Sequence, residues 1–77
     1  MTEVEWMEIF GDNLVDILND ANMSQRELAD ATGVAESTIS NYINKRTLPK
    51  ITALINISEE LDISIDELVY FGDRIKF

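Results

Sequence analysis

Apolar residues recur along the first part of the chain at helical spacing. From about Val4 to Asp20, a step of roughly 100° per residue collects apolar side chains on one face and acidic side chains on the opposite face. The apolar face holds Trp6, Met7, Phe10, Leu14, Ile17 and Leu18, and the acidic face holds Glu5, Glu8, Asp12, Asp16 and Asp20. This pattern predicts an amphipathic first helix that docks by its apolar face. The acidic face is either an ordinary solvated surface or a docking surface for a basic partner.

Two capping-box sequences predict where two further helices begin. In the sequence SQRE at residues 24–27, the Ser24 hydroxyl can accept from the Glu27 amide while the Glu27 carboxylate accepts from the Ser24 amide. The second helix therefore begins at Gln25, and Gly33, which tolerates the left-handed conformation, ends it near Thr32. The sequence SIDE at residues 64–67 predicts the start of a fifth helix, with Gly72 as its expected end.

Helical spacing also predicts a third and a fourth helix between these two. The third follows residues 34 and 35 and runs to about Asn44, where Lys45 and Arg46 place positive charge at the negative end of the helix dipole. Pro49 marks the start of the fourth helix, whose expected apolar stripe is Ile51, Leu54, Ile55 and Leu61. Since no segment of the sequence shows the alternation and turn residues of a hairpin, the predicted fold class is all-α, with five short helices around one core.

The third helix has an unusual polar face. On a helical wheel, its expected core side holds Ala35, Ile39, Tyr42 and Ile43, and its outer side holds Ser37, Ser40, Asn41 and Asn44, with Thr38 flanking. Ser and Asn are only middling helix formers, so helix propensity does not account for them. Short hydroxyls and amides can pair with base edges in the major groove of DNA, and Asn can bind adenine bidentately. Taken alone, a solvated surface explains this face almost as well.

Composition limits the chemistry that the chain can perform. The sequence has 77 residues, 45% of them hydrophobic, which is enough for one small domain with a core. It has no His and no Cys, which removes the usual zinc sites, thiol nucleophiles and neutral-pH proton shuttles. The carboxylates of Glu59, Glu60 and Asp62 show no spacing that suggests a catalytic site. We therefore expect no enzyme activity and no metal or cofactor.

The start and the hydropathy of the chain bear on its location. No run approaches the roughly 20 apolar residues that span a bilayer, and the first residues are acidic where a secretory signal is basic. The absence of Cys suits a reducing compartment. We expect a cytoplasmic location and no membrane partner.

The net charge of −9 argues against nucleic acid until its distribution is considered. Residues 1–23 carry a charge of −6 and residues 51–77 carry −4, whereas residues 24–50 carry +1. The basic residues of that middle segment are Arg26, Lys45, Arg46 and Lys50. Any anion-binding surface is therefore expected in the segment that also contains the polar third helix.

The middle segment resembles a known family. Residues 24–49, SQRELADATGVAESTISNYINKRTLP, are similar to the helix-turn-helix of the phage repressor and Cro-type (XRE-like) bacterial DNA-binding proteins. The similarity extends through FGDNL in the first helix and LDISIDEL before the fifth, from about Phe10 to Tyr70. The matching features within the segment are Gln25, Leu28-Ala29, Gly33-Val34, Ile39-Ser40, Tyr42 and Pro49.

This resemblance implies a five-helix, lambda-repressor-like DNA-binding domain over residues 1–77, with the helix-turn-helix at about 24–46 and a short tail at 73–77. It implies sequence-specific binding of double-stranded DNA by a transcriptional regulator of the repressor type. The residues that fall at the family's base-contacting positions are Ala35, Glu36, Ser37 and Asn41, with Thr38 and Ser40 nearby. Those that fall at its backbone-contacting positions are Gln25, Asn44, Lys45 and Arg46.

Other roles for these residues remain open at the level of sequence. Gln25 and Asn44 could be ordinary helix caps, and Ser40 could bond back to a carbonyl of the preceding turn. Ala35 stands where Ser or Thr would cap the third helix, which forfeits about 1 kcal/mol. Glu36 is repelled by phosphates unless it accepts from a cytosine amino group, so we expect it to affect specificity by attraction or by exclusion.

The expected partners follow from the small size of the basic segment. With few basic residues, one copy would bind DNA weakly, so we expect a homodimer on a palindrome with recognition helices about 34 Å apart. The tail YFGDRIKF at residues 70–77 could form the dimer interface or fold back on its own core. The alternative function is a protein-interaction module, such as an antirepressor or a toxin-binding antitoxin, that uses the acidic first helix or the hydrophobic tail.

Overall fold

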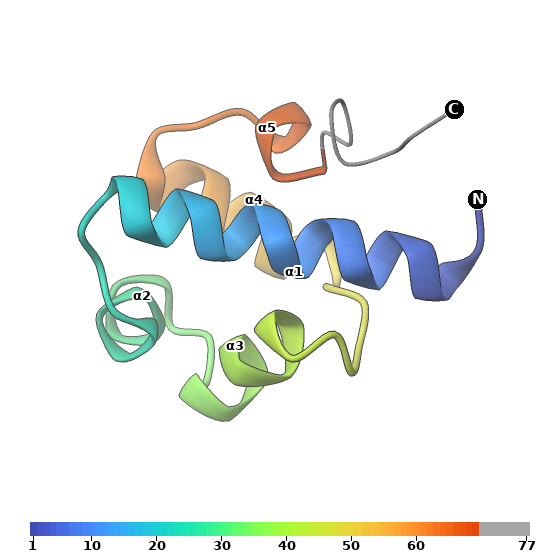
Figure 1. Ribbon diagram of the computed structural model, residues 1–77. Helices are drawn as coiled ribbons and strands as arrows, with labels where there is room; N and C mark the ends of the chain where they lie inside the picture. The colour runs from blue at the N-terminus through green and yellow to red at the C-terminus, as the bar shows by residue number, and fades with distance from the viewer. Residues whose placement is uncertain (70–77) are drawn as a thin grey trace.

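Helix α1 (Glu3–Asp20) runs along the length of the molecule, and the shorter helices pack against it or against one another (Figure 1). The computed structural model describes residues 1–69, and within them the only regular elements are five helices. The others are α2 (Gln25–Thr32), α3 (Glu36–Ile43), α4 (Ile51–Leu61) and α5 (Ile65–Val69). The predicted all-α, five-helix fold is confirmed. The expected helix end at Gly72 and the tail lie outside the described residues.

Side-chain caps fix where the helices begin. Thr2 and Glu5 form a capping box at the start of α1, in which the Glu5 amide donates to the Thr2 hydroxyl at 3.2 Å and the Thr2 amide donates to the Glu5 carboxylate at 3.0 Å. These hydrogen bonds from Thr2 hold the pKa of Glu5 below its ordinary value. Periodicity predicted that this helix begins at about Val4. With this cap, α1 begins one residue earlier, at Glu3. At α5, the Glu67 amide donates to the Ser64 hydroxyl at 3.2 Å, as predicted.

The core joins all five helices. Its fully buried side chains are Leu14, Leu28, Ile39, Ile57 and Leu68, one from each helix. The predicted apolar face of α1 is confirmed, because its members are buried or half-buried while the acidic residues opposite are exposed or half-exposed. Asn13 is a buried polar residue in α1 that the apolar pattern does not predict. Its amide donates to the Leu68 carbonyl at 3.0 Å and ties α1 to α5.

The predicted apolar stripe of α4 is wrong in its rotation. Ala53 and Ile57 are buried, whereas Ile51 and Ile55 are 63% and 40% exposed. The other two predicted members, Leu54 and Leu61, are half-buried at the edge of the core. The sequence ITALINIS is apolar around most of the helix, so a wheel alone does not decide which side faces inward. Contacts of α4 with α2 and α5 determine which side of the helix faces the core.

Helix α1 and the end of α3 approach each other at Gly11. A β-carbon at this position would lie 2.8 Å from the Tyr42 carbonyl oxygen and 3.0 Å from Cγ of Lys45. The adjacent Phe10 and Tyr42 rings pack edge to face, with centroids 5.5 Å apart and an angle of 73° between the ring planes. Backbone therefore packs against backbone here, and only glycine permits the observed distance.

We expect Gly11→Ala to destabilise the fold, although Gly→Ala at an open helix position stabilises by about 1 kcal/mol. The nearest obstacle is a carbonyl oxygen of the main chain, so α1 and α3 must separate, and we expect the free energy of unfolding to fall by about 1–3 kcal/mol. Urea denaturation followed by circular dichroism measures this. Glu8→Ala, at an exposed position of the same helix, is the matched control. A stabilised Gly11→Ala protein would contradict the close approach.

Candidate nucleic-acid interface

The predicted capping box at the start of α2 is present. The Glu27 amide donates to the Ser24 hydroxyl at 3.0 Å, and the Ser24 amide donates to the Glu27 carboxylate at 3.1 Å. This places Gln25 in the first turn of α2, with its side chain half-buried. Ser24 is the N-cap residue of α2, and Gln25 is the first residue of the helix. Gln25 is therefore not the cap that one interpretation of the sequence allowed.

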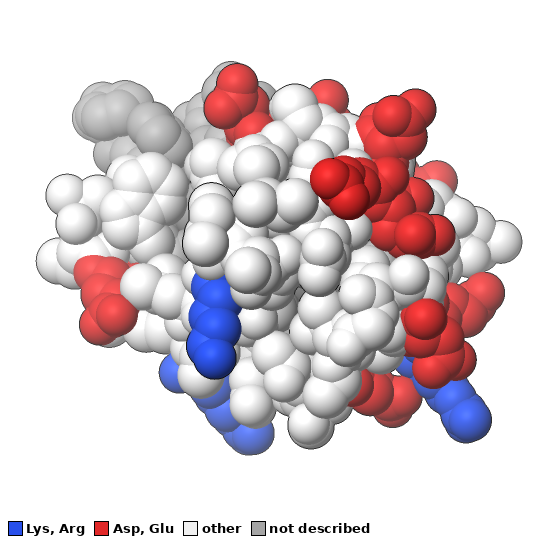
Figure 2. All heavy atoms as spheres, turned by 180° about the vertical axis from the view of Figure 1, so that it is seen from behind, with Lys and Arg blue, Asp and Glu red and all other residues white. Residues whose placement is uncertain are grey.

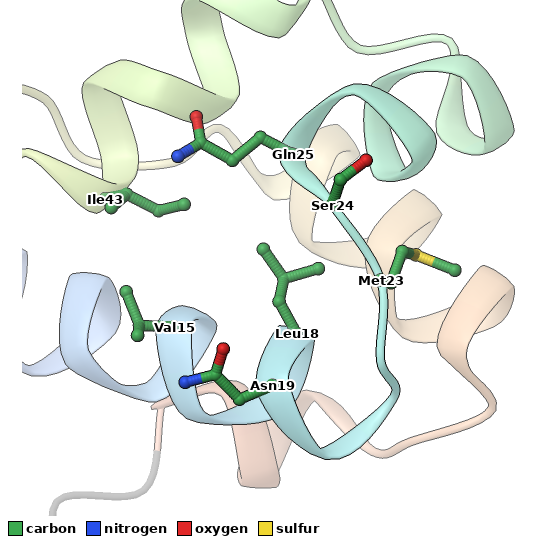
Figure 3. A pocket seen from close by; sticks show the side chains of 7 residues that line it. All are labelled: Val15, Leu18, Asn19, Met23, Ser24, Gln25 and Ile43. Atoms are coloured by element: carbon green, nitrogen blue, oxygen red, sulfur yellow. The ribbon is translucent and has the colours of Figure 1, made fainter.

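Gln25 lies at the edge of a shallow pocket between α1, α2 and α3 (Figure 3). The pocket has a volume of about 260 Å³. Figure 3 shows the Gln25 side chain reaching from α2 toward Ile43 at the end of α3. The pocket is lined by Val15, Leu18, Asn19, Met23, Ser24, Gln25 and Ile43. The Gln25 side chain therefore points into the space between the two helices of the helix-turn-helix.

The turn between α2 and α3 is held by its own backbone geometry. Gly33 has φ +74°, the left-handed conformation predicted for it, and its amide donates to the Ala29 carbonyl at 2.9 Å. Thr32 adds a bridge, since its hydroxyl donates to the Leu28 carbonyl at 2.7 Å and accepts from the Val34 amide at 3.3 Å. The angle at which α3 leaves α2 is thus set by local bonds.

Ala35 is the N-cap residue of α3 and makes no side-chain cap bond, as its residue type predicted. Its predicted place on the core side is wrong, because Ala35 is exposed. It precedes the helix with φ −58° and ψ 141°, so a helical wheel does not describe the direction of its side chain. The exposed Glu36 follows it in the first turn.

Two buried residues hold α3 against the rest of the molecule. Ile39 is fully buried and Tyr42 is 3% exposed. Burial raises the pKa of the Tyr42 hydroxyl, and a hydrogen bond to the backbone of Lys50 opposes that shift. Tyr42 thereby joins α1, which it meets through Phe10, to the residue that precedes α4.

The opposite side of α3 presents the predicted polar row. Ser37 is exposed, and Thr38, Ser40 and Asn41 are half-buried. Within residues 1–69, the Ser37 and Asn41 side chains make no hydrogen bond to the protein.

Ser40 and Asn44 contact each other. The Asn44 side-chain amide donates to the Ser40 hydroxyl oxygen at 3.2 Å, one helical turn away. Within residues 1–69, the Ser40 hydroxyl makes no hydrogen bond to a carbonyl of the preceding turn, which one reading of the sequence allowed. Asn44 is the C-cap residue of α3, and its backbone amide donates to the Ser40 carbonyl at 2.9 Å. The Ser40 hydroxyl keeps its own proton for donation.

The two basic residues after α3 differ in their surroundings. Lys45 has φ +62°, its Cγ lies close to Gly11, and its ammonium forms an ion pair with Asp12 at 2.8 Å. Both side chains of the pair are partly exposed, at 39% and 45%. Arg46 is exposed, and its amide donates to the Asn41 carbonyl at 2.9 Å. The resemblance predicts a phosphate contact for Lys45, and the sequence pattern does not predict its ion pair with Asp12.

Basic side chains gather in one part of the surface, although acidic side chains lie beside some of them. The Lys and Arg residues within residues 1–69 are Arg26, Lys45, Arg46 and Lys50, all exposed. In Figure 2 they lie in the lower part of the molecule, at the level that α2 and α3 occupy in Figure 1, while acidic side chains dominate the upper right. The basic residues therefore accompany the helix-turn-helix.

No helix within residues 1–69 is long and apolar enough to cross a membrane. Within the same residues, no group of acidic side chains is arranged to hold a metal ion.

Comparison with known proteins identifies the family. The sequence matches the family model HTH_3, helix-turn-helix, over residues 14–68. The fold is similar to a crystal structure of an HTH_3 family transcriptional regulator from Vibrio cholerae, with TM-score 0.84 and 21% identity over 94% of this chain and 39% of that chain. It is also similar to the restriction-modification controller protein C.AhdI from Aeromonas hydrophila, with TM-score 0.76 and 22% identity over 80% of this chain and 94% of that one. No curated protein matches the sequence.

The chain is a helix-turn-helix protein. It belongs to the HTH_3 family, which confirms the resemblance to repressor and Cro-type proteins. It spans 39% of the length of the Vibrio cholerae regulator. Family membership supports DNA-binding transcriptional regulation as the class of function.

Proposed function

We propose that this protein binds double-stranded DNA sequence-specifically, as a homodimer on a palindromic operator, and represses transcription. The observation that carries the proposal is the outer face of α3, where hydroxyl and amide groups are exposed or half-exposed on a helix whose other side is locked into the core. A helix fits the major groove, and such groups can pair with base edges there.

Base readout is assigned to α3 and its first turn. Ser37 and Asn41 are the principal readers, because their side chains have no hydrogen-bond partner within residues 1–69. Thr38 and Ser40 flank them, and Ala35 and Glu36 lie at the leading end of the helix. Ser40 would read a base while held by Asn44.

Backbone contacts are assigned to the two ends of the motif. Gln25, in the first turn of α2, lies where amide groups favour a phosphate. Asn44, Lys45 and Arg46 would contact the backbone as the chain leaves α3. Such contacts position the protein without reading sequence.

Dimeric binding follows from the shortage of positive charge. Four basic residues accompany the motif, and one of them is paired with Asp12, so a single copy neutralises few phosphates. Two copies on a palindrome double both the backbone contacts and the bases that are read. The assignment of repression rests on the resemblance to phage repressors. A reporter gene behind the operator tests it, because the protein should lower the expression of the reporter.

Selection of bound sequences from a random duplex pool at low salt tests the reading surface. We expect wild-type protein to enrich a palindrome and Ser37→Ala and Asn41→Ala to blur it, since each removes a group that would pair with a base edge. Asn19→Ala, an exposed Asn on α1, is the control and should enrich the wild-type sequence. No enrichment by folded protein would move the function to the acidic surface of α1 and a protein partner.

Glu36→Gln should strengthen binding to unrelated DNA and relax base preference at one position. The substitution removes a charge that phosphates repel but keeps a side chain that can hydrogen-bond. Titration of a selected and an unrelated duplex measures both effects. An equal gain on the two duplexes would mean that Glu36 acts only through the electrostatic field.

Asp12→Asn should raise the affinity for selected and unrelated duplexes alike, because it releases Lys45 for a phosphate. The logarithmic salt dependence should steepen by about 0.9 per protomer for each added phosphate contact. The half-exposed pair contributes about 1 kcal/mol or less to stability, so the fold should persist. Asp20→Asn removes the same charge at an exposed position of α1 and is the control. Equal gains from both variants would show that Lys45 is not specifically restrained.

A further inference from the structure

A hydrogen bond between two side chains lies on the polar face of α3. The side-chain amide of Asn44 donates to the Ser40 hydroxyl oxygen at 3.2 Å. Ser40 is half-buried in the helix and Asn44 is the exposed C-cap residue. Residues four positions apart lie on the same side of a helix, so the bond runs along the helix surface. It therefore joins a position assigned to a base to a position assigned to the DNA backbone.

The polarity of this hydrogen bond restricts what the Ser40 hydroxyl offers to a ligand. A hydroxyl has one proton and two lone pairs, and here one lone pair accepts from the Asn44 amide. The hydroxyl proton must point away from Asn44, because it would otherwise collide with the N–H that donates to the same oxygen. Glu36, one turn earlier on the same side of α3, attracts the proton in that same direction.

We propose that Asn44 is a positioning residue that makes Ser40 read its base as a hydrogen-bond donor. This inference rests on the proposed function, in which Ser40 faces a base edge in the major groove. Guanine offers O6 and N7 to such a donor there, adenine offers N7, and thymine offers O4. Cytosine offers only its amino group, which is itself a donor. Ser40 therefore discriminates against cytosine on the strand that it faces.

The Asn44 amide also connects the reading of a base to the DNA backbone. A side-chain amide has two N–H donors, and one of them serves Ser40. The second can donate to a phosphate, which is the contact proposed for Asn44. A phosphate contact by itself carries no sequence information. Through Ser40, however, the phosphate that holds the Asn44 amide in place also holds the direction of the hydroxyl proton.

Four versions of the selected operator test the proposal. They differ in both half-sites at the one position whose base preference is lost in Ser40→Ala. We expect wild-type protein to bind the version with its preferred acceptor base about three- to tenfold more tightly than the version with cytosine, the factor that one net hydrogen bond supplies. Fluorescence anisotropy titrations give the ratios of the dissociation constants.

Asn44→Asp should invert this preference in favour of cytosine. A carboxylate only accepts, so it takes the Ser40 proton and leaves the Ser40 oxygen to accept from the cytosine amino group. Asn44→Ala removes the neighbour altogether and should flatten the preference without inverting it. A merely structural role for Asn44 would weaken all four duplexes and leave the order of the bases unchanged.

Two controls separate the direction of the proton from the added charge. Asn56→Asp makes the same substitution at an exposed position of α4 and should keep the wild-type ratios. The double variant Ser40→Ala/Asn44→Asp carries the charge without the hydroxyl, and it should show no preference at this position. Circular dichroism establishes that each variant is folded.

The outcomes distinguish this inference from the proposed function. If wild-type protein selects an operator but Asn44→Asp keeps the wild-type order of bases, the inference is overturned and the proposed function stands. The same holds if Ser40→Ala changes the preference at no position. An inversion that persists in the double variant would assign the effect to the new carboxylate itself, against the proposal. If folded wild-type protein prefers no duplex, the proposed function fails and the inference fails with it.

Discussion

A carbonyl oxygen of α3, that of Tyr42, lies so close to Gly11 of α1 that a β-carbon there would be 2.8 Å away. This backbone contact fixes the position of the polar helix. The Phe10 ring packs against Tyr42 beside it, and Lys45 passes over Gly11 to reach Asp12. The contacts around Gly11 therefore position three segments relative to α1. These segments are the end of α3, the turn that follows it and the start of α4. The side of α3 opposite its polar face is therefore packed against the core through Ile39 and Tyr42.

Electrostatics and hydrogen bonding have separate roles in this account. The acidic face of α1 keeps most of the surface unattractive to DNA, and the few basic residues accompany the helix-turn-helix. One of them, Lys45, is shared with Asp12, which lowers its availability to phosphate. The proposed function therefore combines a small non-specific affinity with discrimination among sequences by uncharged groups on α3. A protein built this way has a low tendency to bind DNA wherever phosphates are exposed.

Features set by short-range chemistry could be predicted from the sequence, and features set by distant contacts could not. The Ser24–Glu27 capping box and the left-handed Gly33 depend on neighbouring residues, and both are found. The rotation of α4 depends on α2 and α5, so the wheel misplaced Ile51 and Ile55. Two interactions join residues that are far apart in the chain, so no local pattern predicts them. They are the hydrogen bond from Asn13 to Leu68 and the ion pair of Lys45 with Asp12. The family's contact positions on α3 came from resemblance, and the structure adds their exposure and their partners.

We propose that uncharged groups on α3, rather than positive charge, give this protein its sequence preference. The most direct test of this proposal is the dissociation constant of the selected operator and of a scrambled duplex, measured by fluorescence anisotropy over a series of salt concentrations. We expect a shallow salt dependence, with a logarithmic slope of about −0.9 for each of a few neutralised phosphates per protomer, and a preference for the operator that persists as salt rises. A steep dependence together with a preference that vanishes at higher salt would contradict the proposal.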